Sequence, residues 1–316
     1  PEWHCGLMTS DPALLDVEIR ALSQGFEDGG ADPKKPKNEG DWLEFCLRFV
    51  FDALRDLRRI RFSDFAAEVS IKNDGSPVST TEQRIETLLR RRLSAFDQTA
   101  SVVGEEHGGE IDCAGISLAI DPIDGTWSFV NRAETFSTTL ALFRQGEADL
   151  AFVANPATGE IAYAGRGVSA RLLQLGLADE PTQGYDLPLS PSTIPGLLVN
   201  LHPCRQMGPA IEALVAAWGA GKVQFVKATG GSPVWSMLEA AKGVCTYANL
   251  WPGKPADPFD LAAGLLLVRA AGGDVIDLSG TAVTAIEHSG PFIAGTNSVN
   301  LQRSAEIIRA ATAIGG

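Results

Sequence analysis

The chain lacks the paired cysteines that mark a disulfide framework or a structural zinc site. Its five cysteines are scattered, odd in number and contain no Cys-x-x-Cys pair. The segment His202-Pro203-Cys204 offers two zinc-type ligands, but nothing near it in the sequence completes a tetrahedron, so we interpret it as a loop. This cysteine usage favours a reducing compartment, and we expect a cytoplasmic protein.

Long apolar runs and excess positive charge are also missing. No run reaches the roughly 18 apolar residues that a membrane span requires, and the N-terminus lacks the basic-then-apolar order of a signal peptide. The formal net charge of −13 disfavours DNA or RNA as a partner, because a nucleic-acid surface needs a positive footprint. It permits a small anionic substrate, since bound metal ions reverse the local field. We therefore expect no membrane and no nucleic acid among the partners.

The 316 residues are enough for a sizeable core and about two domains. Residues 1–40 are predicted to be an N-terminal extension, with a short helix to about residue 24 and then a linker rich in Gly, Asp, Pro and Lys. Pro and Gly recur from about 170 to 195, which predicts a loop-rich boundary. We therefore expect an N-terminal α+β domain over 41–185 and a C-terminal α/β domain over 186–316.

Predicted helices and strands alternate along the chain, which indicates a layered α/β fold. An amphipathic helix is expected to begin at Asp41 and to turn Arg55, Arg58 and Arg59 toward solvent. A second helix is capped by one of residues 79–81. Further helices are expected at 209–218, 234–242 and 261–271, and strands at 100–103, 116–120, 136–143, 150–154, 160–164, 197–201, 223–227 and 274–278.

Metal-ligand chemistry is concentrated in one stretch, Ile120-Asp121-Pro122-Ile123-Asp124-Gly125-Thr126. Asp-Pro is expected to end the preceding strand, because proline lacks the N–H that a ladder needs. The carboxylates of Asp121 and Asp124, with the Ile123 carbonyl between them, can converge as the oxygen ligands that suit Mg²⁺. Asp-Gly then turns the chain, and Thr126 begins a helix whose free N–H groups can bind a phosphate. The alternative is an ordinary surface turn.

Further acids lie at other predicted element ends. Glu82 is in the first turn of a helix, Glu105 follows a strand in a Gly-Glu-Glu segment, and Asp260 opens a buried helix. Each has a purely structural alternative, because the helix dipole favours acids at helix starts and Gly-Glu-Glu can form an exposed turn. Of the neighbouring residues, Glu106 is expected to face away. His107 has no counterpart in the pattern and is expected to be a surface residue.

Four segments taken together resemble the signature blocks of the inositol monophosphatase family, within the fructose-1,6-bisphosphatase-like superfamily of metal-dependent, lithium-sensitive phosphatases. The segments are Lys72-Asn73-Asp74-Gly75-Ser76-Pro77-Val78, Gly104-Glu105-Glu106, Asp121-Pro122-Ile123-Asp124-Gly125-Thr126 and Asp260-Leu261-Ala262-Ala263-Gly264. Several short motifs in the same order are far more specific than any one of them. The resemblance covers about residues 41–313 and implies the family's layered sandwich, with alternating α-β-α-β-α layers, and a homodimer.

The resemblance also implies roles for individual residues. The implied ligands of two or three Mg²⁺ ions are Glu105, Asp121, the Ile123 carbonyl, Asp124 and Asp260. The implied contacts to phosphate or substrate are Asp124, Gly125, Thr126, Ser232 and Asp260. Thr126 and Glu105 resemble the pair that orients the attacking water, while Glu82 stands where the family usually has Asp. Glu82 is therefore a third catalytic candidate, expected to support a water or a third metal with a longer side chain.

These features predict a Mg²⁺-dependent phosphomonoesterase that hydrolyses a small polyol, sugar or related phosphate with metal-activated water. Within the same superfamily, phosphoadenosine-phosphate nucleotidase and fructose-bisphosphatase activity are alternatives. A different class of function is a partner-binding protein with a vestigial site, docking through the N-terminal extension and the arginine-rich helix. This alternative is disfavoured because acids are present at all the implied side-chain ligand positions, where a vestigial site would have lost some of them.

Myo-inositol monophosphate is expected to be a poor substrate. Family members that hydrolyse it have a Glu shortly before the helix-opening Asp, whereas this chain has Asn249-Leu250 there. Leucine cannot accept hydrogen bonds from ring hydroxyls, which would then be left unpaired in a closed site. Trp251, Lys254 or Asp257 can offer other contacts, although Trp251 can equally pack the loop against the core.

Overall fold

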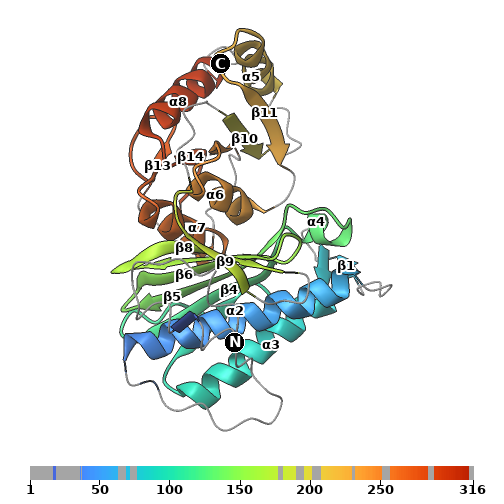
Figure 1. The fold of residues 1–316 in the computed structure, drawn as a ribbon, viewed down its shortest axis with the longest axis vertical. Coiled ribbons are helices and arrows are strands. Elements are labelled where there is room, and N and C mark those ends of the chain that lie inside the picture. The colour runs from blue at the N-terminus through green and yellow to red at the C-terminus, as the bar shows by residue number, and fades with distance from the viewer. Residues whose placement is uncertain are drawn as a thin grey trace.

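The structure, a computed structural model, describes residues 17–18, 36, 38–62, 69–71, 77–176, 181–189, 196–200, 208–229, 232–250, 257–283 and 288–312. Within these ranges, helices and two large sheets stack as α-β-α-β-α layers (Figure 1), which confirms the predicted fold class. The first layer of helices is α2 (Glu39–Phe62) with α3 (Thr80–Phe96). The layer between the sheets is α6 (Pro233–Ala241) with α7 (Pro258–Ala270), and the last is α5 (Gly208–Gly219) with α8 (Ser298–Thr312).

The first sheet has seven strands in the order β3-β4-β5-β6-β7-β8-β9. Strands β3 and β4 are parallel, and every other neighbouring pair is antiparallel. The strands are β3 (Ser101–Gly104), β4 (Ile116–Asp124), β5 (Ser137–Arg144), β6 (Glu147–Asn155), β7 (Glu160–Gly165), β8 (Val168–Leu175) and β9 (Pro181–Asp186).

Both faces of this sheet are buried, because successive side chains of a strand point to opposite sides. In β4, Leu118 and Ile120 pack with α2 and α3, whereas Ala119 packs with α6 and α7. A sheet covered on both faces explains why the strands read as nearly continuous apolar runs. It also places the end of β4 inside the molecule, between two layers of helices.

Strands β8 and β9 correct the prediction of a loop-rich segment from about 170. Residues 168–175 and 181–186 pair with each other and extend the first sheet. Composition misled the prediction because β9 is an edge strand, where Pro181 needs no N–H for a further neighbour. The chain changes sheet only after Asp186, and the division into two domains stays a prediction.

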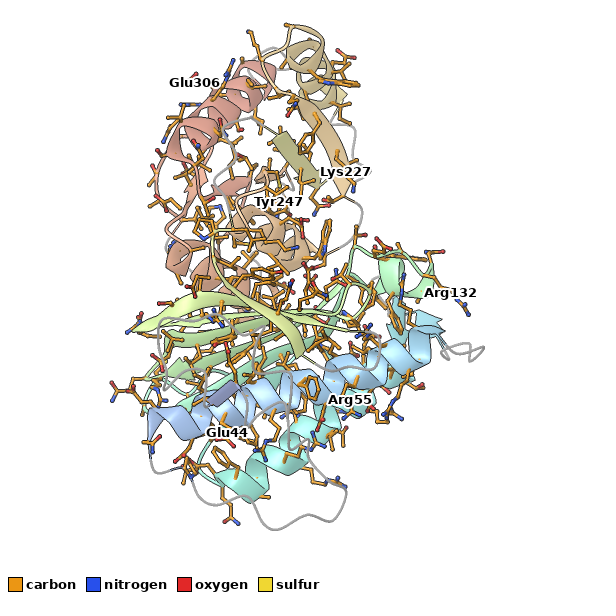
Figure 2. All side chains as sticks on the ribbon, viewed as in Figure 1. Glu44, Arg55, Arg132, Lys227, Tyr247 and Glu306 are labelled. Atoms are coloured by element: carbon orange, nitrogen blue, oxygen red, sulfur yellow. The ribbon has the colours of Figure 1, made fainter. Side chains whose placement is uncertain are left out.

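The second sheet has five strands in the order β11-β10-β12-β14-β13. The strands are β10 (Gly196–Asn200), β11 (Phe225–Thr229), β12 (Thr246–Asn249), β13 (Asp274–Asp277) and β14 (Phe292–Gly295). One face packs on α6 and α7 through residues such as Tyr247, which Figure 2 labels, and the other on α5 and α8. Strands β12 and β14 and helix α8 were not predicted.

A small third sheet pairs β1 (Val69–Ile71) with β2 (Pro77–Ser79) in antiparallel register. It leads directly into α3, whose N-cap is Ser79. The turn 72–76 between the two strands, which the family resemblance includes, lies outside the described residues.

Helix α2 differs from its prediction in two respects. It begins at Glu39 rather than Asp41, because the Asn38 side chain caps it by accepting the Asp41 N–H at 3.1 Å. Arg58 is buried and donates through Nη1 to the Gly176 carbonyl at 2.9 Å, so the expectation that it faces solvent is wrong. Arg55, labelled in Figure 2, lies over the Phe51 ring at 5.5 Å.

Within residues 1–35 of the N-terminal extension, the structure describes Val17 and Glu18, and both are buried against the first sheet. Glu18 pairs with Arg171 of β8, with 3.0 Å between Oε1 and Nε, and accepts the Tyr163 hydroxyl at 2.6 Å. This part of the extension is therefore packed into the core. Among the described residues, no helix combines the length and apolar character needed to cross a membrane.

Candidate active site

Asp121 and Asp124 lie in the last part of β4, which does not end at Ile120 as predicted. The strand continues to Asp124, with a register shift against β5 between Asp121 and Asp124. Pro122 fits because it sits inside this irregularity, where a missing N–H costs no ladder bond. The Asp121 carboxylate accepts the Ile123 N–H at 2.9 Å, and the Pro122 carbonyl accepts the Thr138 hydroxyl at 2.8 Å. These side-chain hydrogen bonds hold the segment between the two ladder pairs with β5, Asp121 with Thr139 and Asp124 with Ser137.

Gly125 ends the strand and begins helix α4 (Thr126–Val130). Its φ of 92° lies in the left-handed region, which glycine adopts without strain. The Gly125 carbonyl accepts the N–H groups of Ser128 at 2.9 Å and Phe129 at 3.1 Å. The helix is short, but its first N–H groups are those that a helix leaves without an internal acceptor.

Glu82 and Thr126 form a hydrogen-bonded pair, although they are far apart in the sequence. The Thr126 hydroxyl donates to Glu82 Oε1 at 2.7 Å, and the Ile123 carbonyl lies 3.2 Å from the same hydroxyl. The other Glu82 oxygen accepts the Ser79 N–H in a capping box that starts α3. Burial raises the pKa of Glu82 to about 7, and the hydrogen bonds from Ser79 and Thr126 oppose that rise.

Asp124 is bound by the start of helix α6, which belongs to the middle layer. Its Oδ2 accepts the Ser232 hydroxyl and, at 3.0 Å, the Val234 N–H. Ser232 is the N-cap of α6 and lies 2.8 Å from the Ser137 hydroxyl of β5. Burial is the main reason that the pKa of Asp124 is raised to about 7, while the bonds from Ser232 and Val234 lower it. Ser232, a predicted substrate contact, is thus a partner of Asp124.

Asp260 lies in the first turn of helix α7, as its sequence context predicted. Its Oδ2 accepts the Asp257 N–H at 3.0 Å, so it also has the capping role of the structural alternative. The start of α7 is joined to β5, because the Thr139 hydroxyl donates to the Phe259 carbonyl at 3.1 Å. Helices α6 and α7 therefore both begin beside the strands that carry the acids.

Glu105 directly follows β3, in the turn that the sequence placed there. The next peptide is held from α3, because the Glu106 N–H donates to Glu86 Oε2 at 2.9 Å. His107 is exposed, as predicted, and its Nδ1 lies 3.3 Å from Glu86 Oε1. Sequence reasoning missed Glu86, although its position one turn after Glu82 was a usable signal.

The acids from these separate segments act on one another electrostatically. The pKa of Asp121 is raised well above its ordinary value, first by burial and then by Glu105, Asp124, Asp260 and Glu82. Every charged group among these causes is another carboxylate, so the acids meet in one region and their negative charges repel. A bound cation would relieve this repulsion.

The donor chemistry of this region fits a hard divalent cation such as Mg²⁺, because the candidate ligands are all oxygen atoms. Among the described residues, no three Asp, Glu, His or Cys side chains are gathered into a ready-made metal centre. The carboxylates are therefore near enough to raise the pKa of Asp121 without forming a compact cluster of three. The loop 251–256 and the glycines at 230–231 lie outside the described residues, while Leu250 is buried.

Known proteins share both the sequence pattern and the fold. The model of the inositol monophosphatase family matches residues 42–313. An inositol-1-monophosphatase of Rhizobium meliloti is 31% identical over 242 residues, which cover 75% of this chain and 86% of that protein. A histidinol-phosphatase of Chlorobaculum parvum is 28% identical over 224 residues, covering 69% of this chain and 79% of that protein.

Among solved structures, a Thermotoga maritima IMPase superposes with a TM-score of 0.68 at 22% identity, covering 87% of this chain and all of that one. This likeness concerns the fold. The layered fold and the phosphatase relatives define a phosphatase, a hydrolase of phosphoric esters. The chain belongs to the inositol monophosphatase family, as its sequence blocks predicted.

Proposed function

We propose that the chain hydrolyses the phosphomonoester of a small polyol, sugar or related metabolite, and that the reaction depends on Mg²⁺ at the end of β4. The observation that carries the proposal is the gathering of Glu82, Glu105, Asp124 and Asp260 around buried Asp121. Such a concentration of negative charge is unfavourable without a cation, and it lies beside a glycine turn suited to a phosphate.

The residues that would hold two or three Mg²⁺ ions are Glu105, Asp121, the Ile123 carbonyl, Asp124 and Asp260. When bound, the metal supplies charge neutralisation and lowers the pKa of a coordinated water. Backbone N–H groups of Gly125 and Thr126 would bind the phosphoryl oxygens. Positioning and electrostatics then suffice, because phosphoryl transfer needs no covalent protein nucleophile.

The chain's own contribution to water activation is the pair of Thr126 and Glu82. Because the Thr126 proton points to Glu82 Oε1, the hydroxyl oxygen can accept a hydrogen bond from water. A Glu82 carboxyl with a pKa of about 7 can take up a proton near neutral pH. Glu105, the partner implied by the family resemblance, is a second candidate for orienting this water. Hydrolysis replaces the bond from phosphorus to the alcohol oxygen by one to the water oxygen.

The substrate is proposed only as a class, because relatives whose names give different substrates match this chain. We expect inositol monophosphate to be a poor substrate, since buried Leu250 follows Asn249 where a hydroxyl-binding Glu would be needed. We further propose a lithium-sensitive, homodimeric enzyme on the family resemblance.

The deciding experiment is phosphate release from a panel of polyol, hexose, histidinol, nucleotide and fructose bisphosphate esters, with Mg²⁺ and with excess EDTA. The proposal requires turnover of at least one monoester and its loss with chelator. Full turnover in EDTA would contradict the metal mechanism. No release from any ester would favour the partner-binding alternative, and preference for the nucleotide or bisphosphate would favour the other activities of the superfamily.

A further inference from the structure

Glu86 is a fully buried carboxylate to which the proposed reaction assigns no role. It lies on α3, and none of its side-chain surface is exposed. Its Oε1 accepts Arg90 Nε at 3.1 Å and Arg90 Nη2 at 2.7 Å, while its Oε2 accepts the Glu106 N–H at 2.9 Å. The two oxygens thus have different partners, and one partner is the peptide that follows Glu105.

Arg90 holds the same turn from a second direction. Its Nη1 donates to the Val102 carbonyl at 3.1 Å, and its Nη2 donates to the Gly108 carbonyl at 2.7 Å. Val102 lies in β3 before the turn, and Gly108 lies after it. Glu86 and Arg90 therefore hold the beginning, the middle and the end of the segment 102–108.

Gly104 shows how closely the turn approaches Glu86. A Cβ atom at Gly104 would overlap the Glu86 carboxylate, so only glycine fits without a shift. The turn is closed by reciprocal backbone hydrogen bonds between Gly104 and Gly108, at 3.1 and 2.9 Å. Glu105 lies between these two glycines, in a backbone that is tied on several sides.

We infer that Glu86 and Arg90 are positioning residues, which fix the 102–108 backbone and thereby aim the Glu105 carboxylate toward the acids of β4. The inference rests on the proposed function, in which Glu105 is a Mg²⁺ ligand. Outer groups that orient a metal ligand typically contribute 10–100-fold to metal affinity or activity. A purely structural cluster would instead support the junction of α3 with β3 and leave Mg²⁺ affinity unchanged.

The direct test is Glu86→Gln, which keeps the size of the side chain. A glutamine has one acceptor oxygen, so it cannot accept from Arg90 and from the Glu106 N–H through separate oxygens. We expect amide hydrogen exchange in a peptide covering 102–108 to rise at least about tenfold, because a hydrogen bond to a charged group is lost. Exchange in α2 should not change.

Mg²⁺ binding supplies the functional readout. Calorimetric titration of the metal-free protein with Mg²⁺ should show an affinity about tenfold or more lower for Glu86→Gln. The Mg²⁺ concentration for half-maximal phosphate release should rise in parallel, with kcat at saturating Mg²⁺ recovering. Arg90→Met should likewise raise amide exchange in 102–108 and lower Mg²⁺ affinity. This second variant supplies the test if Glu86→Gln fails to fold.

Arg92→Met is the matched control on the same helix. Arg92 Nη1 pairs with Asp52 of α2 at 3.0 Å, and its side chain is also largely buried. The Arg92→Met variant should have the same amide exchange in 102–108 and the same Mg²⁺ affinity as the wild type. Unchanged exchange in Glu86→Gln and Arg90→Met, or faster exchange with unchanged Mg²⁺ affinity, would overturn the inference. A wild-type protein that binds Mg²⁺ without releasing phosphate would overturn the proposed function alone.

Discussion

Thr126 has one hydroxyl proton, and two acceptors compete for it. Glu82 Oε1 lies 2.7 Å from the hydroxyl oxygen, and the Ile123 carbonyl lies 3.2 Å from it. The shorter bond, to a carboxylate, is the stronger of the two when Glu82 is ionised. The proton therefore points to Glu82, and the lone pairs of the hydroxyl remain available to a donor such as water.

Thr126→Ala removes this hydroxyl, and we expect kcat to fall roughly 100-fold or more, as for other proton-transfer groups. Thr126→Ser, which retains the hydroxyl, should keep most of the activity. Steady-state kinetics on the best ester of the panel would measure both variants. A change in KM with kcat unaltered would show that Thr126 binds the substrate and does not orient water.

Asp124→Asn separates the charge of Asp124 from its structural bonds. Asparagine still offers an acceptor oxygen to Ser232 and to the Val234 N–H, so the start of α6 should stay in place. Losing a ligand charge should lower Mg²⁺-dependent turnover by roughly 100-fold. Circular dichroism should be unchanged, and the remote Asp277→Asn serves as the matched control. Normal turnover and normal Mg²⁺ dependence in Asp124→Asn would remove this residue from the ligand set.

At the scale of elements, local signals predicted helix starts well. The capping residues 79–82 predicted the start of α3, and Asp260 predicted the first turn of α7. These signals work because a capping side chain and the backbone that it binds are neighbours in the sequence. The Asp124-Gly125 pair is a local signal of the same kind, and it predicted the turn between β4 and α4.

Features that depend on distant residues were not predictable in the same way. Pro122 indicated a strand end, but β5 lies alongside and accommodates a register shift, so β4 continues to Asp124. The pairing of Glu82 with Thr126 joins residues 44 positions apart. One partner of Arg171, Glu18, is 153 residues away, in a short helix that was predicted as part of an N-terminal extension. Spacing in the sequence carries no signal for such contacts.

The ion pair of Glu18 and Arg171 predicts that the extension stabilises the first sheet. Both side chains are fully buried, so Glu18→Ala leaves the Arg171 guanidinium with only its ion pair to the exposed Asp186. We expect a loss of about 3 kcal/mol in the free energy of unfolding, at the low end for a broken buried pair. The exposed pair of Arg166 and Glu147 is the control, and Glu147→Ala should cost less than about 1 kcal/mol. Urea unfolding would measure both. Equal small losses would show that the ion pair of Glu18 and Arg171 contributes little to stability.

At the scale of the whole molecule, the middle layer determines where the acids meet. The N-terminus of helix α6 contacts Asp124, and Asp260 lies in the first turn of helix α7. Both helices lie on the face of the first sheet opposite α2 and α3. The acidic segments are separate in the chain, and the stacking of layers brings them together. The region so formed is acidic, although the proposed substrate is an anion. We therefore expect the proposed cation binding to be linked to folding.

The last prediction concerns this linkage. The pKa of Glu82 rises from 4.5 to about 7 and that of Asp124 from 3.8 to about 7, both mainly because of burial. At a pH between the ordinary and the raised pKa of each group, the folded protein binds more protons than the unfolded chain. The stability contributed by these groups is therefore present at low pH and falls as the pH rises. The metal-free protein should accordingly have a lower Tm at about pH 7 than at about pH 5.

Mg²⁺ should oppose this loss, because it binds the ionised carboxylates and stabilises the folded state by mass action. The rise in Tm caused by saturating Mg²⁺ should thus be larger at about pH 7 than at about pH 5, and calorimetric scans at both values would measure it. NaCl at equal ionic strength is the control for general screening, and Asp124→Asn should reduce the shift. An equal Mg²⁺ shift at the two pH values would mean that these buried acids do not bind the metal.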